Sequence, residues 1–177
     1  MSRTNPYKKK KRSAKKTILI FGEGLGEEMI LKHLRSLYAK DSGVQAKILK
    51  GRGGTAARIV ADAYRTPGDF DKVIVVIDND KTREEMEQAR RGAKERKIEL
   101  IEHTPCLEFI LLLILSNKQE ITGKNSNWCK KKFESEYISK KKRSELKEYI
   151  KIFPKNLLDA KRREISELDR LISILEN

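Results

Sequence analysis

The sequence predicts an α/β protein in which a largely parallel sheet lies between two layers of helices. Short β-branched runs, such as residues 17–21 and 73–77, alternate along the chain with longer amphipathic stretches, as strands and helices in succession do. Only 38% of the residues are hydrophobic, but they are concentrated in these runs, as a buried sheet requires. A length of 177 residues suits one domain, or one domain with an extension.

The expected elements follow this alternation in order. Strands are predicted over 17–22, 44–50, 72–78 and 97–103, where β-branched and other apolar residues gather. Helices are predicted between them, over 26–40, 54–65 and 82–96. Pro105 suits the first turn of a further helix that runs to Leu115, and the apolar character of this segment predicts burial against the sheet.

The chain divides into three predicted segments. Residues 1–16 are expected to form a disordered basic arm, residues 17–116 the α/β domain and residues 117–177 a helical basic extension. Near the end of the extension, apolar residues spaced by three and four predict an amphipathic helix; they are Ile165, Leu168, Ile172 and Leu175. This helix either packs on the body of the protein or forms the seam of a homodimer.

The composition points to a polyanionic partner. Forty lysines and arginines face 26 aspartates and glutamates, which gives a formal net charge of +14. Nucleic acid is the leading partner, ahead of an anionic membrane, although solvated helix surface is the alternative for any single lysine. Two cysteines support neither a disulfide framework nor a zinc cluster. With no secretory signal or membrane span in view, we expect a soluble, cytoplasmic protein.

Clusters of cations mark the predicted nucleic-acid-binding residues. Arg52 lies in a glycine-rich turn that suits either a phosphate or an ordinary strand-to-helix connection. Around Trp128 and Phe133, lysines interleave with aromatics, which suits either base stacking or a helix anchored by its aromatic side chains. The other predicted contacts belong to the arm and the extension: Lys8, Lys9, Lys10, Lys11, Arg12, Lys130, Lys131, Lys132, Lys140, Lys141, Lys142 and Arg143.

Two acidic motifs are unusual in so basic a chain, because each follows an apolar run. Glu23-Gly24-Leu25-Gly26-Glu27 follows the first predicted strand, and Asp78-Asn79-Asp80 ends the third. Ligands bind α/β sheets at such strand ends, and alternation lets Asp78 and Asp80 hold one hard cation, Mg²⁺ or Mn²⁺. An Asx turn is the alternative for the aspartates, and a favourable charge at a helix N-terminus is the alternative for Glu27. A glutamate among the glycines argues against a dinucleotide-binding loop.

Together these motifs resemble the Toprim domain of topoisomerases, bacterial primases and OLD-type nucleases. That domain has Glu-Gly-x-x-Glu after one strand and Asp-x-Asp after a later one. The segment His103-Thr104-Pro105-Cys106-Leu107-Glu108, with the apolar residues after it, is similar to the Pro-Cys-Phe-Glu-x-Trp-Leu-Leu stretch of the small RloB-like proteins, a stand-alone Toprim branch in defence loci. The resemblance covers about residues 17–116 and implies a three-layer, Rossmann-like sheet. It implies catalytic roles for Glu23 and Glu27, and metal binding by Glu23, Asp78, Asp80 and Glu108.

The resulting prediction is a metal-dependent nuclease that hydrolyses phosphodiester bonds in DNA or RNA, tRNA included, in anti-phage defence. The cation would polarise the phosphodiester and activate water, and Glu23 would move the proton. The resemblance also implies an ATPase partner. A non-catalytic nucleic-acid-binding module and a primase-like nucleotidyl transferase are the alternatives. His33 and His103 are expected to be structural, although His103 ends a predicted strand and is a possible neighbour of the site.

Overall fold

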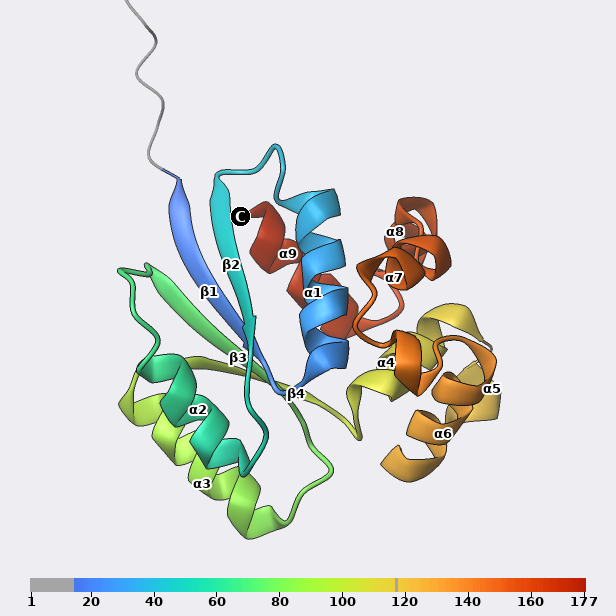
Figure 1. Ribbon diagram of the computed structural model, residues 1–177, viewed down its shortest axis with the longest axis horizontal. Helices are drawn as coiled ribbons and strands as arrows, with labels where there is room; N and C mark the ends of the chain where they lie inside the picture. Colours follow the sequence, from blue (N-terminus) through green and yellow to red (C-terminus); the bar gives the residue numbers. More distant parts are fainter. Residues whose placement is uncertain (1–14, 117) are drawn as a thin grey trace, which may run out of the picture.

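The computed structural model describes residues 15–116 and 118–177. Within them a four-stranded sheet has the order β2-β1-β3-β4, and every pair of neighbours is parallel (Figure 1). The predicted α/β fold with a parallel sheet between helices is therefore confirmed. The strands, each within two residues of its expected bounds, are β1 (Lys16–Gly22), β2 (Val44–Lys50), β3 (Lys72–Asp78) and β4 (Glu99–His103).

Helices connect the strands, and further helices follow β4. The side chains of Thr55, Thr82 and Asn125 each accept a hydrogen bond from the amide three residues later, and thereby cap the helices that follow them. The helices are α1 (Leu25–Tyr38), α2 (Ala56–Tyr64), α3 (Arg83–Glu95), α4 (Leu107–Leu115), α5 (Lys118–Ile121), α6 (Ser126–Glu136), the short 3₁₀ helix η1 (Lys140–Lys142), α7 (Leu146–Ile152), α8 (Lys155–Lys161) and α9 (Ser166–Glu176).

Pro105 does not lie in the first turn of α4, so that part of the prediction is wrong. The Thr104–Pro105 peptide bond is cis, and the backbone is still extended at Cys106, with φ −159° and ψ 169°. Cys106 is the N-terminal cap of the helix, which begins at Leu107. The segment from Thr104 to Cys106 therefore carries the chain from the end of β4 to the start of α4.

Alternate residues of the central strands face two hydrophobic cores. Ile20 and Val76 belong to the core shared with α1, α4 and the C-terminal helices, whereas Phe21 and Ile77 belong to the core formed with α2 and α3. Figure 1 shows α2 and α3 on one side of the sheet and α1 with α9 on the other. Since Asp78 is two residues after Val76, its side chain points to the α1 and α4 side.

The C-terminal helices join the same core as the sheet. Leu168, Leu171, Ile172 and Leu175 of α9 are buried in it together with residues of α1 and β2. For this helix, packing on the body of the protein is confirmed. A single chain does not test homodimer formation, which stays a prediction.

The N-terminal arm falls mostly outside the described residues. The arm's predicted nucleic-acid contacts lie outside the described residues; they are Lys8, Lys9, Lys10, Lys11 and Arg12. Strand β1 begins at Lys16, the last residue assigned to the arm. Among the helices of residues 15–116 and 118–177, none has the length and apolar character needed to cross a bilayer.

Candidate active site

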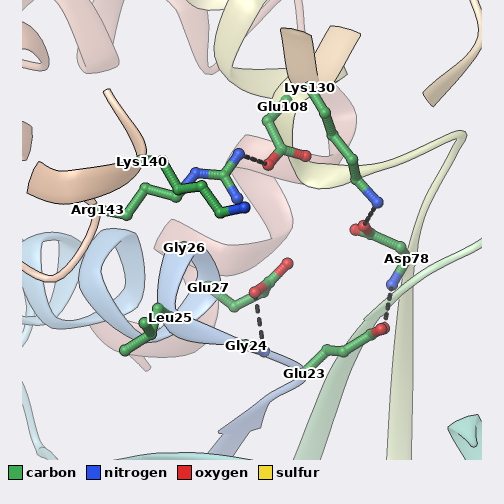
Figure 2. Close-up of a pocket in the computed structure, with 10 residues that line it drawn as sticks. All are labelled: Glu23, Gly24, Leu25, Gly26, Glu27, Asp78, Glu108, Lys130, Lys140 and Arg143. Atoms are coloured by element: carbon green, nitrogen blue, oxygen red, sulfur yellow. Dashed lines mark hydrogen bonds and ion pairs between the residues drawn. The ribbon is translucent and has the colours of Figure 1, made fainter. Parts of the chain in front are cut away.

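The carboxyl ends of β1 and β3 bring Glu23 and Asp78 together. The strands pair with Gly22 opposite Val76, and the Glu23 amide donates a hydrogen bond to the Val76 carbonyl at 3.1 Å. The Asp78 amide in turn donates to Glu23 Oε2 at 3.2 Å (Figure 2). Two acidic residues that are 55 positions apart in the chain thus meet at one edge of the sheet.

Helix α4 adds a third carboxylate to this edge. The Leu107 amide donates a hydrogen bond to Asp78 Oδ1 at 2.8 Å, which fixes the first turn of α4 beside the end of β3. Glu108, the next residue, is only 7% exposed. One ligand atom each from Asp78, Cys106 and Glu108 lies within 4.8 Å of the other two, so this buried group has the spacing of a metal site.

Glu27 joins the site because α1 approaches the end of β1 closely at Gly22. A Cβ atom at Gly22 would lie 2.6 Å from Glu27 Cβ, closer than real contacts allow. The Gly24 amide donates to Glu27 Oε2 at 3.0 Å, so Glu27 also stabilises the start of the helix. Burial and then the charge of Asp78 raise the pKa of Glu27 to about 8. At neutral pH this carboxyl group is therefore mostly protonated.

Burial perturbs the other carboxyl groups as well. It raises the pKa of Asp78 despite the opposing charge of Lys130, and burial followed by the charge of Asp78 raises the pKa of Glu108. Burial also acts to raise the pKa of Asp80, but the hydrogen bond and charge of Lys130 hold it below its usual value. Crowded, buried carboxylates of this kind favour the binding of a cation, which stabilises their charged forms.

Asp78 and Asp80 converge on one cation, as the Asp-x-Asp spacing predicts, and in this structure that cation is a lysine ammonium group. Lys130 Nζ of α6 lies 3.0 Å from Asp78 Oδ2 and 2.7 Å from Asp80 Oδ2. Asp80 is not part of the compact group formed by Asp78, Cys106 and Glu108. Lys130, predicted as a nucleic-acid contact, is a partner of the acidic site in this structure.

Two further cations pair with site carboxylates. Lys81 Nζ lies 2.7 Å from Glu23 Oε1, and Arg143 Nη2 lies 2.8 Å from Glu108 Oε1. The sequence placed Arg143 among the nucleic-acid contacts and indicated no role for Lys81. Both now hold a carboxylate in place, and Figure 2 shows Arg143 reaching across the site to Glu108.

These residues enclose a cavity of about 450 Å³. Its wall combines carboxylates from strand ends and helix starts with cations from the C-terminal helices. Lys140 of η1 also points into it (Figure 2). The cavity is lined by Glu23, Gly24, Leu25, Gly26, Glu27, Asp78, Glu108, Lys130, Lys140 and Arg143.

The remaining predicted nucleic-acid contacts lie elsewhere. Lys132 pairs with Glu136 at 2.7 Å, and Lys142 lies 3.9 Å from Glu148. Lys131 and Lys141 are exposed. Arg52 lines a second, basic cavity beside α2.

The aromatic pair of α6 serves mainly as an anchor. Phe133 is 1% exposed and belongs to the main core, so the anchoring alternative is confirmed for this residue. Trp128 is half-buried against the same core. The ammonium groups of Lys124 and Lys132 lie over its ring, 5.2 and 5.5 Å from the centroid.

The two histidines do not line the cavity. His33 Nε2 makes a 2.7 Å hydrogen bond with the Phe153 carbonyl oxygen. His103 is 1% exposed, and neither of its ring nitrogens has a hydrogen-bond partner within the described residues. Burial lowers the pKa of His103 to about 4. The structure thus supports the expected structural role for both residues.

Cys106, Lys81 and the pairing role of Lys130 are the site features that the sequence reasoning missed. Cys106 precedes Glu108 by two residues in the segment that carried the family resemblance, so its position was a usable signal. Lys81 directly follows Asp80. No local pattern indicated that Lys130 would pair with the aspartates, because only packing of α6 against α4 brings it to the strand end.

Fold and site define a class of protein: a parallel α/β protein with buried carboxylates and cations gathered at the carboxyl edge of its sheet. The chain matches the family described as RloB-like protein over residues 18–170. It therefore belongs to the RloB-like family, and the match includes helix α6 with Lys130 and the turn after η1 with Arg143. Comparisons with curated proteins and with solved structures gave no match.

Proposed function

We propose that this RloB-like protein is a metal-dependent nuclease of the Toprim type that hydrolyses phosphodiester bonds in nucleic acid. The observation that carries the proposal is the gathering of Glu23, Glu27, Asp78 and Glu108 around one cavity in a chain of net charge +14. Glu27, Asp78 and Glu108 have raised pKa values, and carboxyl groups perturbed in this way within a cavity are frequent at functional sites. The basic remainder of the chain suits a polyanionic substrate.

The donor chemistry fits a hard divalent cation. Asp78 and Glu108 offer carboxylate oxygens, the ligands that Mg²⁺ and Mn²⁺ prefer. Burial raises the pKa of the Cys106 thiol to about 12, so this residue remains a neutral neighbour and is a poor ligand for a hard ion. When bound, such a cation supplies Lewis-acid polarisation of the phosphodiester and activation of water.

The other residues of the candidate active site have separate proposed roles. Glu27, whose pKa is raised by burial and by the charge of Asp78 in the metal-free protein, offers a protonated carboxyl group in the cavity wall for proton transfer. Glu23 is held by Lys81 and orients the end of β3 through the Asp78 amide. Lys140 and Arg143 line the cavity and offer positive charge to a phosphate. We therefore assign proton transfer to Glu27 rather than to Glu23.

Cleavage and metal binding test the proposal together. Labelled tRNA, single-stranded DNA and duplex DNA are incubated with purified protein and Mn²⁺, Mg²⁺ or EDTA, and Mn²⁺ binding is measured by calorimetry. We expect cleavage only with metal, and loss of both cleavage and Mn²⁺ binding in Asp78→Asn and Glu108→Gln. Glu84→Gln is the control, because Glu84 is an exposed carboxylate on α3. Unchanged Mn²⁺ binding in both site variants would contradict the proposed metal site.

A non-catalytic nucleic-acid-binding module is the second proposal, and one observation favours it. Lys130 and Lys81 already pair with Asp78, Asp80 and Glu23, so the acidic cluster has internal counterions that suit a structural role. Salt-sensitive, metal-independent binding without turnover would select this alternative. Incorporation of labelled nucleoside triphosphates would instead indicate primase-like nucleotidyl transfer.

The cellular setting is also part of the proposal. The Toprim resemblance supports a role in anti-phage defence beside an ATPase partner, in the cytoplasm. Adding a candidate ATPase to the cleavage assay, with and without ATP, tests whether a partner raises the activity.

A further inference from the structure

A second cavity lies on the opposite face of the sheet from the candidate active site. Its volume is about 410 Å³, and Phe21 and Leu49, which line it, pack in or against the α2 and α3 core. Four of its lining residues are cations, Lys50, Arg52, Arg58 and Arg65, and we call this cavity the basic pocket. The other lining residues are Phe21, Leu49, Asp62, Thr66 and Pro67.

The cations of the basic pocket have no ion-pair partners among the described residues. Within residues 15–116 and 118–177, no carboxylate oxygen lies within 4.0 Å of the charged nitrogens of Lys50, Arg52, Arg58 or Arg65. Asp62 is the lone carboxylate among the lining residues, so the formal charge of the wall is +3. Like charges gathered around one concave surface repel one another and raise the local concentration of anions.

The chemistry of the wall suits phosphate groups. Arginine presents a planar fork of donors that matches phosphate oxygens, and three of the four cations are arginines. The first amide of α2 is already occupied, because the Ala56 amide donates to Glu85 Oε1 at 2.9 Å. The side-chain cations therefore carry the inference, and the helix N-terminus does not.

The linings of the basic pocket and of the candidate active site come closest along the chain at the end of β1, on opposite faces of the sheet. Phe21 lines the basic pocket and Glu23 lines the active-site cavity, with only Gly22 between them. The Gly51 amide donates to the Gly22 carbonyl at 2.8 Å, and a Cβ at Gly51 would lie only 3.1 Å from the Glu23 carbonyl oxygen. Two residues of strand span about 7 Å. A polymer that follows the carboxyl edge of the sheet would thus touch both cavities.

We propose that the basic pocket binds a backbone phosphate of the nucleic-acid strand whose neighbouring phosphodiester enters the active-site cavity. The identity of the ligand rests on the proposed function, while the anion site rests on the pocket alone. Arg52, Arg58 and Arg65 bind the strand from the α2 side of the sheet, whereas Lys140 and Arg143 face it from η1 and the turn that follows. The pocket thereby sets which part of the strand reaches the carboxylates.

Binding without metal tests this inference apart from catalysis. Fluorescence anisotropy measures the affinity for a labelled single-stranded oligonucleotide in EDTA over a series of salt concentrations. The test protein is the double variant Arg58→Gln, Arg65→Gln. The control is Arg91→Gln, Lys94→Gln, which removes the same charge from exposed positions of α3. Circular dichroism checks that both variants fold.

We expect the test variant to bind about tenfold more weakly than the control variant. The slope of log affinity against log salt should also fall by about 0.7 for each phosphate that the pocket no longer binds. Equal reductions in affinity in the two variants would overturn the inference. It would also be overturned if the test variant lost binding of inorganic phosphate or free nucleotide but kept the oligonucleotide affinity of the control variant. If binding falls as expected but no substrate is cleaved, the inference stands and the hydrolytic function fails. If Asp78→Asn abolishes cleavage while the two double variants bind the oligonucleotide alike, the hydrolytic function stands and the inference about the basic pocket fails.

Discussion

His103 offers a sharp test of the structure, because it is a buried titratable group beside the proposed site. Its strand position pairs with Asp78, yet its ring is 1% exposed, lacks hydrogen-bond partners among the described residues and does not line the cavity. Burial lowers its pKa from 6.5 to about 4. The folded protein thus keeps His103 neutral in a pH range where the unfolded chain protonates it.

The sign and size of the effect follow from this pKa. Well above pH 6.5 the histidine is neutral in both states, so its titration does not change the free energy of unfolding. As the pH falls from 6.5 towards 4, the unfolded state gains a proton that the folded state cannot accept, and the free energy of unfolding decreases. A shift from 6.5 to about 4 corresponds to a loss of about 3 kcal/mol over the whole range.

Replacing the histidine should remove this loss. We expect His103→Leu to be about 1 kcal/mol more stable than wild type at pH 7, because it removes buried polar atoms without partners among the described residues. We expect the advantage to grow by about 3 kcal/mol towards pH 4. Urea unfolding across this range measures both differences. His103→Asn is the matched control, since it removes the titration but keeps a polar group.

Two outcomes would refute this reasoning. Parallel stability curves for wild type and His103→Leu between pH 7 and 4 would mean that His103 is accessible to protons in the folded state. Loss of metal-dependent cleavage in a folded His103→Leu protein would mean that the ring takes part in the chemistry. We expect that cleavage to be retained.

Three further predictions concern the acidic site itself. Glu27→Gln should be more stable than wild type by up to about 5 kcal/mol at pH 8 and above. The reason is that the raised pKa of Glu27 makes wild type lose stability as the pH rises from 4.5 to about 8. Equal urea midpoints at pH 5 and pH 8.5 in both proteins would contradict this. Gly22→Ala should destabilise the fold by about 2 kcal/mol, because its Cβ would lie 2.6 Å from Glu27 Cβ, whereas Gly43→Ala, with open space around it, should change the urea midpoint little. Lys130→Met should destabilise the metal-free protein by about 1 to 2 kcal/mol by leaving Asp78 without its cation, and Mn²⁺ should raise its melting temperature more than that of wild type.

The sheet could be predicted from the sequence because its signals are local. Strand β3 is a run of five apolar residues that ends in an aspartate, and burial on both faces leaves such a run few other conformations. The same logic placed Glu23 and Asp78 at strand ends, since a parallel sheet puts successive carboxyl ends on one edge. The hydrogen bond from the Leu107 amide to Asp78 could not be predicted, because it depends on how the chain turns at Pro105.

The cations that pair with the site carboxylates could not be predicted from local sequence patterns. Lys130 and Arg143 belong to a lysine-rich segment in which every cation looks alike, and the runs 130–132 and 140–143 offered no reason to separate one from another. Packing of α6 on α4 selects Lys130 for the aspartates and leaves Lys131 exposed. Similarly, the raised pKa of Glu27 follows from its burial beside Gly22, whereas in sequence it is only an acidic residue in a first helical turn.

The pairing of carboxylates with cations also resolves a difficulty in the proposed function. A bare cluster containing Glu23, Asp78 and Glu108 would repel a phosphodiester before any cation bound. Lys81, Lys130 and Arg143 lie within 3.0 Å of these carboxylates and offset much of that charge, so the cavity can accept a polyanion. In the metal-free protein the Lys130 ammonium group lies 3.0 Å from Asp78 Oδ2 and 2.7 Å from Asp80 Oδ2, and a divalent ion bound to Asp78 would take its place. On this view the internal ion pairs prepare the site for the polyanionic substrate, and an increase in both oligonucleotide affinity and cleavage in Lys130→Met would show the opposite.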